Sequence, residues 1–102
     1  MKPYVVAPEA EDDLRQIWRY LLGEGGLEVA DRIQAELVDD FEALADFPGR
    51  GHKRLDLTSH SVLFLSVYQY MIVYRVTGQV EIVAVSHGKR NLKRLLKGRL
   101  NK

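Results

Sequence analysis

Three apolar runs in the second half of the chain constrain its fold more than any other feature. They lie within residues 62–94 and read VLFLSV, YMIVYRV and VEIVAV. Val, Ile, Tyr and Phe dominate them, and these side chains favour the pleated, half-buried surface of a β-sheet. Thr77-Gly78-Gln79 separates the last two runs at the spacing of a tight hairpin. The pattern predicts three consecutive antiparallel strands, but the join near Val67 to Gln69 has no Gly, Pro or Asn and leaves the first register open.

A short strand and two amphipathic helices are predicted before these runs. Lys2 to Ala7 favours a strand, which Pro8 ends. Apolar residues between Leu14 and Leu22 then recur at i, i+3, i+4, i+7 and i+8, which is one helical stripe. This helix is expected to end at three glycines: Gly23, Gly25 and Gly26. A second helix is expected from about Leu27 to Asp46, and a connection of about four residues predicts an antiparallel helical hairpin.

The end of the chain predicts one more helix. Residues Lys89 to Leu100 read KRNLKRLLKGRL, with Leu92, Leu95 and Leu96 expected to face inward. The expected fold class is therefore α+β: an N-terminal strand, an α-helical hairpin packed on a small antiparallel β-sheet, and a short basic C-terminal helix. The length of 102 residues predicts a single domain over residues 1–102.

Composition excludes several classes of protein. The absence of Cys excludes thiol catalysis, disulfides and Cys-ligated metals. No His or carboxylate cluster has the spacing of metal ligands, so no metal or other cofactor is expected. No run approaches the roughly 18–20 apolar residues that cross a bilayer, and the opening MKPYVVAPEAEDD is not a signal peptide. The expected location is the cytoplasm, with no membrane partner.

The small net charge of +1 conceals an asymmetry between the two halves of the chain. Residues 1–49 hold 4 Lys/Arg and 12 Asp/Glu, whereas residues 50–102 hold 11 and 2. Such a division predicts two surfaces with different partners, unless the halves only attract one another within the fold. Seven of the basic residues lie in the last 14 positions. They predict a surface for an anionic partner, either an acidic protein patch or a nucleic acid; a solubilising tail is the alternative.

Two residues of the predicted strands can carry function. Arg75 interrupts an apolar run, and burial of an unpaired Arg is costly, so it must reach solvent, a carboxylate or a ligand. Glu81 across the hairpin is its expected structural partner, and a shared cationic site is the alternative. His87 stands where the last strand leaves the sheet, next to Arg90, and its ordinary pKa near 6.5 suits acid–base work. A structural strand-end role is the commoner use of such a His.

The order of elements and several strings resemble the RelE/ParE superfamily of bacterial toxins over nearly the whole chain. The strings are YVVAPEAEDDLRQIWRYL, ADRIQAEL followed by FEALADFPGRGHKR, and YMIVYRV…VEIVAVSHGKRNLKRLL. The resemblance implies the hairpin-on-sheet fold and a cognate, ParD-like antitoxin protein whose C-terminal segment wraps and neutralises the toxin. RelE-like members cleave mRNA in the ribosomal A site, whereas ParE-like members poison DNA gyrase and block replication.

The C-terminal sequence favours the ParE-like branch. SHGKRNLKRLL looks like the His-Gly-basic-Arg ending of those toxins, and no Tyr follows Tyr74, where the ribonucleases often have one. The resemblance therefore implies a gyrase inhibitor with no catalytic residues. Its expected target-binding residues are His87, Lys89, Arg90, Lys93, Arg94 and Lys97. Its expected antitoxin-binding residues are Trp18, Leu21 and Arg75, although Trp18 and Leu21 also fit the core stripe of the first helix.

Two alternatives stay open. A ribosome-dependent mRNA endonuclease, with the ribosome and mRNA as partners, would use Arg75, His87 and Arg90 as catalytic residues. A degenerate, non-toxic binding module of the same fold is the other. For the gyrase inhibitor, we expect truncation after Gly88 to leave a folded but non-toxic protein.

Overall fold

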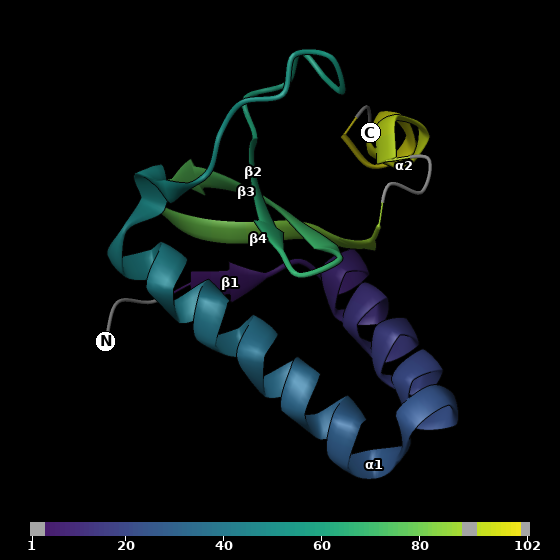
Figure 1. The fold of residues 1–102 in the computed structure, drawn as a ribbon. Helices are drawn as coiled ribbons and strands as arrows, with labels where there is room; N and C mark the ends of the chain where they lie inside the picture. The colour runs from purple at the N-terminus through teal and green to yellow at the C-terminus, as the bar shows by residue number, and fades with distance from the viewer. Residues whose placement is uncertain (1–3, 89–91, 101–102) are drawn as a thin grey trace.

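A computed structural model describes residues 4–88 and 92–100. The elements follow the order β1 (Tyr4–Val6), α1 (Pro8–Asp46), the 3₁₀ turn η1 (Pro48–Arg50), β2 (Leu63–Val67), β3 (Tyr70–Thr77), β4 (Gln79–His87) and α2 (Leu92–Leu100). Figure 1 shows α1 on one side of the sheet and α2 on the other. The predicted α+β fold class, with its N-terminal strand and short C-terminal helix, is confirmed.

α1 is a hairpin of two helical arms that meet at Gly26. The φ of 84° and ψ of −179° at this residue lie far from helical values, in a region that glycine alone adopts readily. Figure 1 shows the second arm returning from this point toward the sheet. The predicted helical hairpin is confirmed. Its connection is one non-helical residue rather than about four, because Gly23 and Gly25 remain within the helix.

The four strands form one sheet in the order β1-β4-β3-β2. β3 is antiparallel to both β2 and β4, as the three apolar runs predict. β1 runs parallel to β4, with Tyr4 opposite Val80, so the sheet is mixed rather than wholly antiparallel. Composition can predict that a short apolar segment is a strand. Its neighbour and its direction in the sheet depend on the path of the chain between the strands. The sequence pattern therefore did not reveal the parallel pair.

A two-residue turn of unusual composition sets the register that the sequence left open. Val67 pairs with Tyr70, so Tyr68 and Gln69 form the turn between β2 and β3. Tyr68 has a φ of 55°, a left-handed conformation that is rare for an aromatic residue. Its hydroxyl donates a 2.8 Å hydrogen bond to Glu36 on the second arm of α1. The hydrogen bond to Glu36 thus connects this glycine-free turn to α1.

The sheet has two buried faces, and a bulge in β4 changes which of its side chains lie on each. Val73 pairs with Ala84 and Tyr74 with Ile82, which leaves Val83 without an opposing residue. The face toward α1 buries six side chains of the last two strands: Tyr70, Ile72, Tyr74, Val80, Ile82 and Val85. The other face buries a second set together with Leu92 and Leu96 of α2: Val62, Phe64, Val73, Val83 and Ala84. The sheet is thus the middle of three layers, and α2 is part of the core.

Candidate functional site

α2 presents a cationic face to solvent. Leu92 and Leu96, one turn apart, are buried against the sheet, and Leu95 is partly buried, so the inward face is as predicted. Three of the expected target-binding residues lie on the exposed side of this helix: Lys93, Arg94 and Lys97. Lys89 and Arg90, also expected there, lie outside the described residues. The helix therefore combines an apolar attachment with a charged outer surface.

The loop between η1 and β2 lies on the same side of the sheet as α2 (Figure 1). Leu57 of this loop packs partly against the cluster that contains the α2 leucines. Asp56 has a pKa below its usual value, chiefly because Arg54 hydrogen-bonds it, and Lys93 adds to the effect. Lys53 and Arg54 are exposed. The basic character predicted from the second half of the chain is thus shared by the loop and α2.

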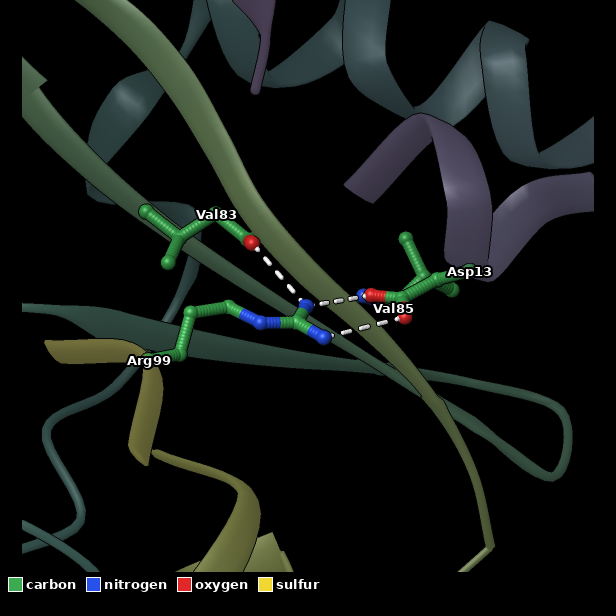
Figure 2. Close-up of polar contacts among 4 residues, drawn as sticks. All are labelled: Asp13, Val83, Val85 and Arg99. Atoms are coloured by element: carbon green, nitrogen blue, oxygen red, sulfur yellow. Dashed lines mark hydrogen bonds and ion pairs between the residues drawn. The ribbon is translucent and has the colours of Figure 1, made fainter. Parts of the chain in front are cut away.

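Arg99 is the exception among the cations of α2. Its Nη1 lies 2.6 Å from Oδ2 of Asp13 and its Nη2 lies 3.2 Å from Oδ1, so two hydrogen bonds join the groups (Figure 2). The two side chains are only 14% and 13% exposed. The guanidinium also donates to the Val83 carbonyl oxygen at 3.3 Å. Charge pattern alone placed Arg99 with the surface cations, whereas here it attaches the end of α2 to the start of α1.

The same ion pair bonds two main-chain groups of β4. β1 ends at Val6, so among the residues that the structure describes no strand neighbours β4 on that side from Val83 onward. Oδ2 of Asp13 accepts a 3.0 Å hydrogen bond from the Val85 N–H, while Arg99 donates to the Val83 carbonyl (Figure 2). The pair therefore bonds main-chain groups that a longer β1 would otherwise bond. Two residues 86 positions apart cannot be paired from a single sequence.

A cavity of about 600 Å³ lies between the first arm of α1, the end of β4 and α2. Its lining combines aromatic, amide, cationic and apolar side chains with part of the β4 backbone: Gln16, Tyr20, Ser86, His87, Arg94 and Leu95. Tyr20 is 52% exposed. The sequence analysis did not identify this groove, because its walls come from three elements far apart in the chain. Its position beside the cations of α2 makes it part of the candidate site.

His87 lies where the sequence predicts, at the end of the last strand. Its ring lies between two tyrosines, with centroids 5.4 Å from Tyr20 and 5.1 Å from Tyr70. The chain then turns at Gly88, which has a φ of 68° and donates its N–H to the Gln69 carbonyl. The imidazole is thus held by aromatic packing at the point where the chain leaves the sheet.

Arg75 pairs with Glu81 across the hairpin, which is the structural role that the sequence predicts for it. The Nε–Oε1 distance is 2.6 Å, and this hydrogen bond raises the pKa of Arg75. Arg75 lies opposite Glu81 in the register, and His87 lies at the other end of β4. At about 3.3 Å per residue, the six positions between Glu81 and His87 span roughly 20 Å. The structure therefore does not bring Arg75 and His87 into one site.

The expected antitoxin-binding residues on α1 lie in or beside the core. Leu21 is only 8% exposed. Trp18 is partly buried, and its Nε1 donates a 3.0 Å hydrogen bond to Asp31 of the opposite arm. Both positions match the core-stripe alternative. Leu22, expected on the same stripe, is instead 38% exposed, and Leu27 beyond the Gly26 break is 58% exposed.

The described residues provide no membrane span and no metal cluster. Within residues 4–88 and 92–100, no helix is long and apolar enough to cross a membrane. The same residues contain no group of three His, Asp or Glu side chains placed to hold a metal ion.

The family model of the ParE toxin of type II toxin–antitoxin systems, parDE, matches residues 4–92. The chain belongs to the ParE toxin family. It is 34% identical over 91 residues to Toxin ParE1 of Caulobacter vibrioides, which covers 89% of this chain and 94% of that protein. A chain of the chromosomal ParDE TA system from P. aeruginosa shares the fold, with a TM-score of 0.74 at 20% identity over 87% of this chain and 98% of that one. This ParE-family chain is therefore a toxin of a type II toxin–antitoxin system, with an antitoxin as its partner. The family match ends at Leu92, so it includes β4 and His87 but not the exposed cations of α2.

Proposed function

We propose that this toxin inhibits DNA gyrase and thereby blocks replication, acting as a ligand of its target rather than as an enzyme. Membership of the ParE family supports the proposal. The proposal rests on one observation: Arg75 and the cations of α2 lie in separate places, near opposite ends of β4. Arg75 is bound to Glu81 at one end, while the other end adjoins the exposed cations and groove of α2. This arrangement suits recognition of an anionic surface.

The working surface is the outer face of α2 with the adjoining groove. Lys93, Arg94 and Lys97 contact the target, joined by Lys89 and Arg90 from the segment outside the described residues. The buried leucines and the Arg99–Asp13 pair hold the helix in place before binding. Less ordering entropy is then lost when the target is bound. The proposal places the chain in the cytoplasm with gyrase.

The cognate antitoxin neutralises the toxin by covering this surface. An acidic segment of a ParD-like antitoxin complements the cations of α2, and its apolar side chains fit the groove beside Tyr20. Trp18 and Arg75 are each half or less exposed and offer smaller contacts, and Leu21 offers little surface. Occupation of the α2 face then excludes the target.

Supercoiling of relaxed plasmid by purified gyrase tests the proposal. We expect the toxin to inhibit supercoiling and to increase cleaved DNA. The variant Lys93→Glu/Arg94→Glu/Lys97→Glu should lose at least about tenfold in potency, since it reverses three surface charges that each contribute up to about 1 kcal/mol. Arg15→Glu/Arg19→Glu/Arg32→Glu makes the same charge change on exposed positions of α1 and serves as the matched control. Gyrase unaffected by the toxin, or equal loss in both variants, would contradict the proposal.

The endonuclease alternative gains no support from this geometry. Of its expected residues, Arg75 lies on β3 opposite Glu81, and His87 lies at the far end of β4. Arg90 is outside the described residues. An activated 2′-OH needs its base and its charge-stabilising group within reach of one phosphate.

A further inference from the structure

We propose that the groove between α1, β4 and α2 binds a single strand of nucleic acid, with a base against Tyr20 and the backbone along α2. The inference rests on the proposed function in one respect, because it adds direct DNA contact to gyrase inhibition. It concerns a site that neither the family match nor the charge pattern identifies.

The groove combines the two features that single strands require. Single-strand binding sites pair aromatic faces, on which bases stack, with cations that follow the phosphates. Here Tyr20 and His87 line the same cavity as Arg94. Tyr20 is 52% exposed, and its ring centroid lies 5.4 Å from that of the His87 imidazole on β4. A half-exposed aromatic side chain and a guanidinium therefore line one concave site.

Beside its aromatic and apolar lining, the groove offers a polar group for the edge of a base. Gln16 lies one helical turn before Tyr20 on α1, lines the groove, and offers both an amide donor and an acceptor. Asp13 also lines the groove, but its oxygens already accept from Arg99 and the Val85 N–H. Its negative charge is compensated within the protein and leaves the groove open to an anion.

The cations of α2 extend the site along a phosphate backbone. Lys93 and Lys97 are one helical turn apart and exposed, beside Arg94 at the groove. Of the described residues near this face, Asp56 carries the opposing charge, and it is paired with Arg54. Protein-binding surfaces are depleted in Lys, whereas phosphate contacts recruit it. A phosphate backbone therefore fits these cations, and the acidic antitoxin segment of the proposed function would compete with it for the same surface.

A short strand fits the groove better than a duplex. The groove of about 600 Å³ is lined by side chains of three elements, and stacking on Tyr20 requires a base whose face is free. A duplex keeps its bases stacked and would contact only the outer cations. The proposal thus predicts a preference for single strands that a charged tail would not show.

Fluorescence anisotropy with a labelled 12-nucleotide DNA strand, without gyrase, tests the inference. We expect the full chain to bind the strand more tightly than the corresponding duplex. Tyr20→Ala should weaken binding roughly tenfold, the loss of one base–aromatic stack, and Tyr20→Phe should retain it. Arg94→Gln should lower the slope of log affinity against log salt by about one. Tyr68→Ala removes a more exposed aromatic side chain on the β2–β3 turn, at 73% against 52% for Tyr20, and is the control.

Equal binding of strand and duplex, equal effects of Tyr20→Ala and Tyr68→Ala, or no binding at low salt would each overturn the inference. Full competition by polyglutamate at the same charge concentration would also overturn it, by showing that charge alone acts. An RNA strand of the same sequence, bound equally, would support a single-strand site that ignores the sugar. If the chain inhibits gyrase but does not bind the DNA strand, only this inference fails. If it binds the strand but does not inhibit gyrase, only the proposed function fails.

Discussion

The two helical layers that enclose the sheet differ in size, charge and attachment. α1 spans Pro8–Asp46, carries twelve acids and three arginines, and is fixed by a long apolar stripe. α2 spans Leu92–Leu100, carries four cations and no acid, and is fixed by Leu92, Leu96 and the Arg99 ion pair. The charge asymmetry of the sequence thus becomes a separation across the sheet. The large layer supplies most of the core, and the small one has a separate, exposed cationic side.

The largest effect should follow loss of the α2 ion pair. Arg99→Ala leaves the Asp13 carboxylate nearly buried without its cation, and breaking such a pair costs about 3–5 kcal/mol in the free energy of unfolding. Urea denaturation measures the change. Arg15→Ala is the contrasting variant, because its ion pair with Asp12 is exposed and such pairs contribute at most about 1 kcal/mol. Equal losses in the two variants would show that α2 is not attached as described.

The attachment of α2 can also be weakened through its apolar side. Leu96 is 1% exposed, so Leu96→Ala should cost about 2–5 kcal/mol in unfolding free energy, measured by the same denaturation. Leu95→Ala, one position earlier and only partly buried, should cost clearly less. A reversed order would place the other side of the helix against the sheet.

These contacts change the expectation for a chain ending at Gly88. Removing α2 would uncover apolar side chains of the sheet, among them Val73, Val83 and Ala84, and would leave Asp13 unpaired. We therefore expect the truncated chain to lose stability as well as toxicity. Substitution of the exposed cations separates the two properties.

A smaller effect on the target, and almost none on the fold, is expected at the outer face of α2. Lys97→Gln should leave the unfolding free energy within about 0.5 kcal/mol, as for most surface changes. It should reduce gyrase inhibition roughly two- to fivefold, the effect of one surface charge contact. Arg32→Gln on the acidic layer should reduce neither quantity. Titration of supercoiling activity against toxin concentration compares the two variants. An unchanged titration for Lys97→Gln would show that the working surface lies elsewhere.

The smallest effect is expected near the β3–β4 hairpin. Arg75→Gln removes a partly exposed cross-strand pair and should cost at most about 1 kcal/mol. Growth after induction should be arrested as by the unaltered chain. An endonuclease with Arg75 in its active site would instead lose toxicity completely in this variant.

Local pattern predicted most of the fold and little of the site. Period-two and helical periodicities are properties of neighbouring residues, so the strands, the hairpin and the inward leucines of α2 were visible. The parallel pairing of β1, the turn at Tyr68 and the Asp13–Arg99 pair depend on contacts between distant segments. Charge identified Lys93, Arg94 and Lys97 as surface cations but could not distinguish them from Arg99.

The groove illustrates the same limit. Tyr20 falls outside the apolar stripe of the first helix and has no special neighbours in sequence. Tyr20 becomes a candidate binding residue only because the fold places His87 and Arg94 around the same cavity. An aromatic residue off the buried stripe was the one available signal.

Pulse labelling of DNA and protein synthesis, within minutes of inducing this chain without its antitoxin, tests the central claim most directly. The account predicts that DNA synthesis stops first while translation continues. An early stop in translation with DNA synthesis intact would contradict the gyrase proposal and favour a ribosomal target.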